Sequence, residues 1–166
     1  MIRKATLQDI PAITAIYREY VLHSTATFEI VPPTESQMQD RVESFAKHYP
    51  CFVYETGRNQ IAGYCYAHPW KEKEAYRHTL ETTIYLHPEQ KGKGFGKQLM
   101  KHLIDACRKE GYHALIACIT AENKSSCDFH QTLGFEQVSR FKEVGCKFGR
   151  FLDVIDYELL LKEKSL

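Results

Sequence analysis

The clearest pattern in this chain is the recurrence of apolar side chains every three or four positions. It is strongest over residues 99–107, where the apolar stripe ends shortly before Gly111, as a buried helix does. Asp9 followed by Pro11, and Thr34 after a proline-containing loop, are residue types that start helices. Helices are therefore predicted over about residues 10–21, 34–49, 99–111 and 125–133.

Runs of β-branched and aromatic residues mark the expected strands. Residues 51–54 and 61–68 flank Thr56-Gly57-Arg58-Asn59, a combination that predicts a β-hairpin. Further strands are expected near residues 2–6, 79–86, 114–119, 135–141 and 152–161.

The order of these elements indicates the fold class. Strands come in hairpins early in the chain and alternate with helices later, which is typical of a mixed α/β fold. We expect a central mixed sheet with helices on both faces. A length of 166 residues favours a single domain, residues 1–166.

Composition narrows the partners and the compartment. Twenty-two Lys and Arg against 21 Asp and Glu give a formal net charge of +1, which disfavours nucleic acid as a partner. The start of the chain does not resemble a signal peptide, and no stretch approaches the ~20 apolar residues of a membrane span. Six scattered cysteines show neither a Cys-x-x-Cys pair nor zinc-ligand spacing. We expect a cytoplasmic protein with reduced thiols, no metal and no membrane partner.

The segment Lys91-Gly92-Lys93-Gly94-Phe95-Gly96-Lys97 lies between an expected strand and the strongest helix. Glycines at alternate positions let consecutive backbone N–H groups approach an anion beside a helix N-terminus, which suits a pyrophosphate. The spacing differs from the dinucleotide fingerprint and from the Walker loop. A purely structural turn remains the alternative at this stage.

The same segment resembles the acetyl-coenzyme A signature of GNAT N-acetyltransferases, with Lys91 at the position of a Gln or Arg, and the resemblance continues through Asn123 and 133–135. Residues 67–70, 75–81 and 148–153, with Thr27-Phe28-Glu29, resemble the branch of phosphinothricin and methionine sulfoximine acetyltransferases. The resemblance implies a GNAT fold, a homodimer, acetyl-coenzyme A as cosubstrate and a small amino-acid-like acceptor. The implied cofactor-binding residues are Ile84, Tyr85, Leu86, Lys91, Gly92, Lys93, Gly94, Phe95, Gly96, Lys97 and Asn123.

Two residues are candidates for the chemistry. Glu81 is a carboxylate in a strand of Leu, Thr, Ile and Tyr, and it is the candidate base that deprotonates the acceptor amine; an outward-facing strand residue is the alternative. Residues 82, 84 and 86 should face the side of the sheet opposite Glu81. His130 stands where many GNAT enzymes have a tyrosine, and it is a candidate to relay a proton or bind the thiol. Backbone N–H groups near Tyr85 and Leu86 are expected to stabilise the oxyanion.

Four residues are candidates for binding the acceptor. Arg77, with Lys71, brackets the loop entering the Glu81 strand and would hold an amino-acid carboxylate. Phe28 and Glu29 are expected to approach from the first loop. Ordinary surface positions are the alternative for each, and a helix cap is the alternative for Asn123.

Direct attack on the thioester in a ternary complex is expected, because Cys127 lacks an apparent base and is expected to be a packed thiol. Two other functions remain open. One is acetyl transfer to a polyamine or a protein N-terminus, and the other is a non-catalytic coenzyme A-binding regulator.

Overall fold

The computed structural model describes residues 1–57 and 60–161. In these residues no helix combines the length and apolarity needed to cross a bilayer. The elements in chain order are β1 (Ile2–Lys4), η1 (Leu7–Asp9), α1 (Ile10–His23), α2 (Glu35–Ala46), β2 (Cys51–Glu55), β3 (Ile61–Pro69), η2 (Glu74–Tyr76), β4 (Thr79–Leu86), η3 (Pro88–Gln90), α3 (Phe95–Lys109), β5 (Ala114–Thr120), α4 (Lys124–Thr132), β6 (Glu136–Gln137), β7 (Phe141–Lys147) and β8 (Arg150–Leu160).

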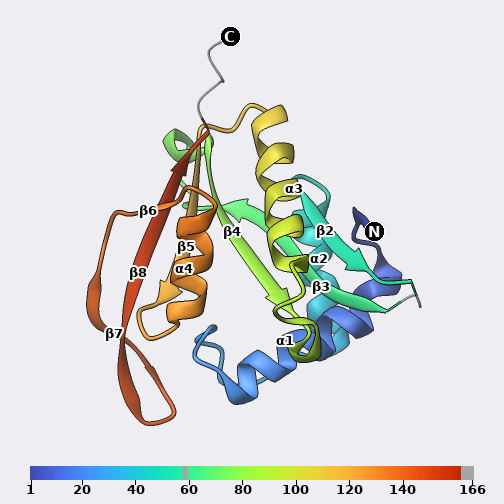
Figure 1. Cartoon of the computed structure of the whole chain (residues 1–166), viewed down its shortest axis with the longest axis horizontal. Coiled ribbons are helices and arrows are strands. Elements are labelled where there is room, and N and C mark those ends of the chain that lie inside the picture. Colours follow the sequence, from blue (N-terminus) through green and yellow to red (C-terminus); the bar gives the residue numbers. More distant parts are fainter. Residues whose placement is uncertain (58–59, 162–166) are drawn as a thin grey trace.

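Eight strands of the described chain form one mixed sheet in the order β1-β2-β3-β4-β5-β8-β6, with β7 paired to β8. The first four strands are antiparallel neighbours, whereas β4 and β5 run parallel. A parallel neighbour needs a crossover, and α3 supplies it between β4 and β5 (Figure 1). The expected α/β fold with a mixed sheet is confirmed.

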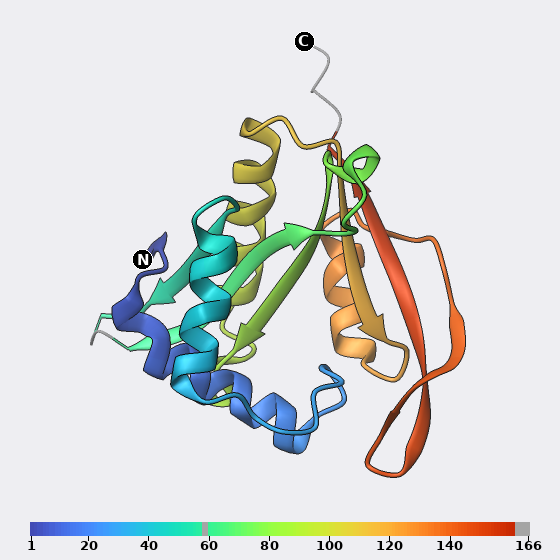
Figure 2. The same cartoon turned by 180° about the vertical axis from the view of Figure 1, so that it is seen from behind.

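Helices cover both faces of the sheet. Figure 1 shows α3 and α4 on the near face, and Figure 2 shows α1 and α2 on the other. The stripe that predicted the third helix is fully buried, with Leu99, Met100 and Leu103 at 0% exposure. A second apolar cluster, which includes Ile13, Ile16 and Val53, lies under α1 and α2. Two cores therefore hold the sheet from opposite sides.

Most predicted helix and strand positions agree with the structure. Thr34 caps α2, because its hydroxyl oxygen accepts a hydrogen bond from the Gln37 N–H at 3.2 Å. The second helix ends at Ala46 rather than Tyr49. The predicted hairpin joins β2 to β3 in antiparallel register, but Arg58 and Asn59 of its turn lie outside the described residues.

The prediction for the end of the chain was wrong in one respect. Instead of a strand over 135–141, the chain forms the short β6 and then a separate strand, β7, which pairs with β8. The turn between β7 and β8 is Phe148-Gly149, and both residues have positive φ, 52° and 71°. This is the backbone of a tight type I′ hairpin, but Phe in place of Asn or Asp hides the signal in the sequence.

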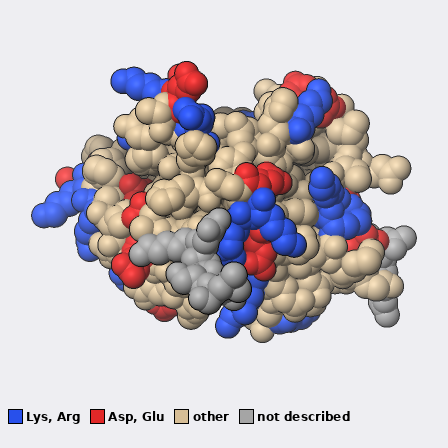
Figure 3. Space-filling view, turned by 90° about the horizontal axis from the view of Figure 1, so that it is seen from above, with Lys and Arg blue, Asp and Glu red and all other residues tan. Residues whose placement is uncertain are grey.

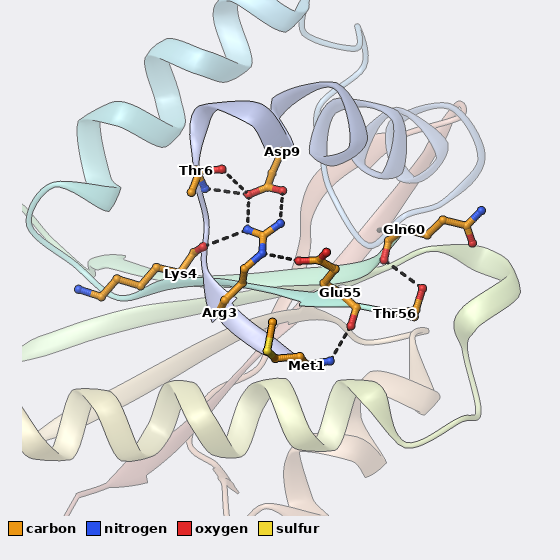
Figure 4. Close-up of polar contacts among 8 residues, drawn as sticks. All are labelled: Met1, Arg3, Lys4, Thr6, Asp9, Glu55, Thr56 and Gln60. Atoms are coloured by element: carbon orange, nitrogen blue, oxygen red, sulfur yellow. Dashed lines mark hydrogen bonds and ion pairs between the residues drawn. The ribbon is translucent and has the colours of Figure 1, made fainter. Parts of the chain in front are cut away.

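An ion-pair network fixes the N-terminus to the edge of the sheet (Figure 4). The guanidinium of Arg3 donates two hydrogen bonds of 2.8 Å to the Asp9 carboxylate and a third of 2.5 Å to Glu55. Thr6 adds its N–H and hydroxyl as donors to Asp9. The network joins β1, η1 and β2, which are neighbours in space but separate in sequence.

Candidate active site

Strands β4 and β5 separate part-way along their length, and this opens the sheet. They pair only from Thr79↔Ala114 to Glu81↔Ile116, and beyond that point they diverge (Figure 1). On its other edge β4 stays paired with β3 as far as Leu86. The second half of β4 therefore has one backbone edge that no neighbouring strand uses.

Hydrogen bonds identify which amides lie on that open edge. The His87 N–H donates to the Ala62 carbonyl at 2.8 Å, so the alternation of the antiparallel ladder turns Tyr85 towards β3 and Ile84 and Leu86 away from it. The Leu86 N–H already donates to the Tyr20 hydroxyl at 3.3 Å, and that hydroxyl donates to the Leu86 carbonyl at 2.7 Å. The Ile84 amide is thus better placed to meet an oxyanion than those of Tyr85 or Leu86.

The gap between the strands belongs to a cavity of about 650 Å³. It extends from Glu81 to the glycine turn, with α1, the loop after α1, β5 and the start of α4 as its other walls. Of the residues expected in the site, those that line the cavity are Phe28, Glu81, Ile84, Tyr85, Leu86, Lys91, Gly92, Gly94, Gly96, Lys97, Asn123 and His130.

The glycine turn has the geometry of an anion cradle. Gly92 and Gly94 have φ of 75° and 81°, and a Cβ at either would meet no protein atom within 4 Å. Gly94 is the N-cap of the 15-residue helix α3, whose first N–H groups have no partner within the helix. Lys91 and Lys97 add positive charge at the cavity wall. These features fit a pyrophosphate.

Two residues of the same segment face elsewhere. The Lys93 ammonium donates to the Gln90 side chain at 3.0 Å, and the Phe95 ring packs against Tyr54 with ring centroids 4.4 Å apart. Neither is among the residues lining the cavity. Any contact from these two to a bound pyrophosphate would therefore come from the backbone.

Glu81 lies at the end of the cavity opposite the glycine turn. Its side chain is 29% exposed, and its carboxylate Oε1 is 4.0 Å from Nε2 of His68. Burial raises the pKa of Glu81. The negative charge of Asp156 raises this pKa further, whereas a positive charge on His68 lowers it, and the net shift is upward. A carboxylate with a raised pKa is a stronger base, as amine deprotonation requires.

His130 is a buried imidazole with a defined tautomer. Its Nδ1 is 2.8 Å from the Ser126 carbonyl, and because a carbonyl only accepts, Nδ1 carries the hydrogen and Nε2 keeps a lone pair. Burial lowers the pKa of His130. The ring is therefore neutral at pH 7, and Nε2 accepts hydrogen bonds, for example from a thiol or an ammonium.

Asn123 combines two roles that the sequence left open. It is the N-cap of α4, where its side-chain oxygen accepts a hydrogen bond from the Ser126 N–H at 3.2 Å, and it also lines the cavity. Cys127, on the same helix, is 5% exposed and does not line the cavity, as expected for a packed thiol.

The loop after α1 forms one wall of the cavity and is held from two directions. The buried Lys147 of β7 donates from its ammonium to the carbonyls of Ser24 and Thr27, both at 2.7 Å. The Thr120 hydroxyl of β5 donates to the Thr25 carbonyl. Phe28 reaches the cavity from this loop.

The remaining acceptor candidates lie outside the cavity wall. Glu29 forms an ion pair with Arg41 of α2. Arg77 has a 62% exposed side chain on the loop before β4, 3.9 Å from Glu74, and the Lys71 ammonium stacks over the Trp70 ring at 4.1 Å. In this single chain the structure does not bring these three residues to Glu81.

Several wall residues were not expected from the sequence: Tyr20, His68 and Cys118. Each reaches the site through contacts with residues far away in the sequence: Tyr20 by its hydrogen bond to Leu86, and His68 and Cys118 by strand pairing with β4. His68 lies opposite Glu81 in the register of β3 with β4, and Cys118 follows Ile116, the β5 partner of Glu81. The prediction of a β3–β4 hairpin pairing would have been needed to find His68.

The acetyltransferase (GNAT) domain family matches residues 2–155 of the chain. The chain belongs to this family. It is 35% identical over 161 residues to an L-methionine sulfoximine/L-methionine sulfone acetyltransferase of Pseudomonas aeruginosa, a match covering 96% of this chain and 94% of the relative.

Solved structures of this family share the fold. A phosphinothricin acetyltransferase of Sinorhizobium meliloti, solved with acetyl-coenzyme A, has a TM-score of 0.94 and 38% identity, covering 96% of this chain and 87% of that one. A ribosomal-protein-alanine N-acetyltransferase of Brucella melitensis also has a TM-score of 0.94, with 33% identity and coverage of 96% and 99%. The expected GNAT membership is confirmed.

Proposed function

We propose that this GNAT chain is a single-domain N-acetyltransferase that moves an acetyl group from acetyl-coenzyme A to the amino group of a small amino-acid-like acceptor, such as methionine sulfoximine or phosphinothricin. One observation carries the proposal: a single cavity joins the glycine turn to Glu81 across the open edge of β4. A phosphate cradle and a base at its two ends are what this transfer needs.

The donor half of the cavity supports acetyl-coenzyme A. Backbone N–H groups of the 91–97 turn would hold its pyrophosphate, with Lys91 and Lys97 adding charge. The free edge of β4 offers hydrogen-bonding groups to the amide-bearing arm, and Asn123 faces it from α4. When bound, the donor supplies the acetyl thioester.

The reacting end supports direct attack. Glu81 accepts a proton from the acceptor ammonium, and the Ile84 N–H is available to the developing oxyanion. His130 contributes an acceptor nitrogen rather than an acid, because its Nδ1–H is already engaged by Ser126. The thiolate would then take its proton from the attacking nitrogen.

The charge distribution of the protein favours a small acceptor over a large, highly charged one. Net charge is +1, and on the face shown in Figure 3 basic and acidic residues are interspersed. We infer that Arg77, with Lys71, attracts the acceptor carboxylate at the entrance, while Phe28 packs against its side chain. Six free cysteines favour a reducing compartment, in line with a cytoplasmic enzyme.

The test follows free thiol release with acetyl-coenzyme A and two matched acceptors, methionine sulfoximine and its decarboxylated analogue. We expect the carboxylate-bearing acceptor to be preferred. Arg77→Ala should lower kcat/KM for methionine sulfoximine by about tenfold to a hundredfold, because it removes a charged hydrogen bond to the carboxylate. The same variant should change kcat/KM for the decarboxylated analogue much less.

Arg18→Ala is the control, because Arg18 is an exposed arginine on α1 that does not line the cavity. Equal losses for both acceptors would remove Arg77 from the site. No thiol release with any amine would favour the coenzyme A-binding regulator.

A protein N-terminus is the second candidate acceptor, because the Brucella neighbour is named for ribosomal-protein alanine. A peptide beginning with alanine therefore belongs in the same assay. A kcat/KM for the peptide above that of every amino acid would replace the small-acceptor proposal.

We also propose a homodimer. Its support is the exposed apolar surface of the β7–β8 hairpin, where Val144, Phe148 and Phe151 are 61%, 56% and 69% exposed. Light scattering after size exclusion measures the mass directly. A monomer at micromolar concentration would contradict this part.

A further inference from the structure

His68 and Glu81 lie opposite one another on the same face of the sheet. They are register partners in the β3–β4 ladder, and Nε2 of His68 is 4.0 Å from Oε1 of Glu81. Both line the cavity, with side chains 32% and 29% exposed. The two side chains are therefore almost equally open to solvent.

The hydrogen bond on the other ring nitrogen defines the chemistry of this pair. Nδ1 of His68 is 3.0 Å from the Pro69 carbonyl, and a carbonyl can only accept, so Nδ1 carries a hydrogen. In the neutral ring, Nε2 then has a lone pair directed to the side of Glu81. At 4.0 Å the two acceptors are too far apart for a direct hydrogen bond, but one water could donate to both.

The other titratable groups around Glu81 cannot take its proton. Burial raises the pKa of Tyr66 to about 12, and partial desolvation with the negative charges of Glu81 and Asp156 raises that of the exposed Cys118 to about 12, so each already holds its proton at neutral pH. Asp156 on β8 accepts a hydrogen bond from the Ser139 hydroxyl at 2.9 Å and brings negative charge. Among the described groups that face Glu81, His68 is therefore the one that presents a ring nitrogen without a hydrogen.

We propose that His68 is a positioning residue that takes from Glu81 the proton removed from the acceptor ammonium and releases it to solvent. This inference rests on the proposed function, since it assumes that Glu81 is the base. The ammonium proton moves to the Glu81 carboxylate, then through one bridging water across the 4.0 Å gap to Nε2 of His68, and then to bulk water. The neutral amine forms the C–N bond as the C–S bond breaks, and its second proton goes to the thiolate.

The experiment compares kcat/KM of the wild type and His68→Gln between pH 6 and 8, in the presence of acetyl-coenzyme A and methionine sulfoximine. Only an imidazole whose Nε2 still has its lone pair can take a proton from Glu81, so protonation of the ring at low pH blocks this relay. We expect the ratio of wild type to variant to be several-fold larger at pH 8 than at pH 6. Ionisation of the acceptor itself cancels in this ratio. His48→Gln, at an exposed position after α2, is the control.

The Glu81→Gln background separates the two hypotheses. If His68 acts through Glu81, adding His68→Gln to Glu81→Gln should change kcat less than twofold. A pH-independent ratio, or equal losses in both backgrounds, would overturn the role of His68 and leave Glu81 as the base. Unchanged turnover in Glu81→Gln alone would overturn both.

A measurement without catalysis tests the premise. Ring ¹⁵N shifts of the free protein report the tautomer, and the signal missing in His68→Gln assigns the residue. We expect the hydrogen on Nδ1 at pH 8. A hydrogen on Nε2 would overturn the proposal, because that nitrogen would have no lone pair for the proton.

Discussion

At the scale of single residues, the site depends on where a few polar groups interrupt apolar strands. Glu81 lies between Leu80 and Thr82, which are 1% and 5% exposed, yet its own carboxylate reaches the cavity. Partial burial raises its pKa towards neutrality, and that makes it a better base than a solvated carboxylate.

Replacing Glu81 with Gln removes the base and keeps the size of the side chain. The chemical step should slow by about two to four orders of magnitude at pH 7, while acetyl-coenzyme A still binds. Single-turnover kinetics and titration with coenzyme A measure the two effects separately. Glu136→Gln, on the exposed β6, is the control. Wild-type turnover where chemistry limits the rate would refute the assignment.

Gly94 is the residue on which the proposed phosphate cradle should depend most. Gly94→Val should weaken coenzyme A binding by about tenfold to a hundredfold, because the side chain would occupy the space of the pyrophosphate and displace its N–H donors. Titration of folded protein with coenzyme A tests this.

Gly111→Val is a matched control for backbone strain. Gly111 has φ of 83° against 81° for Gly94, and a Cβ at either meets no protein atom within 4 Å. Gly111 lies after the other end of α3, away from the cavity. If both variants bind coenzyme A equally well, the cradle does not lie at Gly94.

At the scale of elements, β7 stabilises a wall to which it is not adjacent in sequence. The Lys147 ammonium lies at the C-terminal end of α1, where it also approaches the Tyr20 carbonyl at 3.4 Å and complements the helix dipole. Gly145 on the same strand leaves room for the Phe28 ring, which a Cβ would overlap.

Lys147→Met keeps the apolar stem and removes the ammonium, so the Ser24 and Thr27 carbonyls lose their donor. We expect the free energy of unfolding to fall by about 1–3 kcal/mol and the KM for the acceptor to rise more than the KM for acetyl-coenzyme A. Urea unfolding and steady-state kinetics measure these effects. Lys142→Met, exposed on the same strand, should change neither. Equal increases in both KM values would argue against a specific effect on the loop.

The elements found from the sequence are those with local signals. The α3 stripe, the Thr34 cap and the β2–β3 pairing depend on residues close in the chain. The strand β7 was missed, because its burial pattern is almost wholly exposed and its turn uses Phe148. Hydrophobic periodicity cannot report a strand whose stability comes from pairing with β8.

At the scale of the whole molecule, the site residues that could be predicted from the sequence are again those in local patterns. The glycine turn and Glu81 are short local patterns on one strand–turn–helix unit, and the sequence predicted both as parts of the site; in the structure they line one cavity. His68 reaches the cavity, and Lys147 reaches the loop that forms its wall, only through long-range pairing, so no local pattern predicted either role. Arg77 was expected from the family resemblance, and the single chain leaves it exposed.

Whole-molecule stability should depend on pH through the N-terminal ion pairs. Burial acts to raise the pKa of Asp9, but hydrogen bonds from Arg3 and Thr6 outweigh it, so the pKa is lowered from its usual 3.8. A lowered carboxyl pKa contributes stability that is fully present above the unfolded value and is lost as pH falls through the folded value.

Arg3→Met should therefore lower the free energy of unfolding by about 2–4 kcal/mol at pH 7, because the buried Asp9 carboxylate loses its cation. Without Arg3 the pKa of Asp9 is higher than in the wild type, because burial is then opposed only by the Thr6 hydrogen bonds, so the variant protonates this group earlier as the solution is acidified. The difference from the wild type should shrink as pH falls from 7 towards 3.5. Urea unfolding at several pH values measures it, with Arg18→Met, exposed on α1, as the control. A difference that stays constant or grows on acidification would mean that the Arg3–Asp9 pair does not carry this stability.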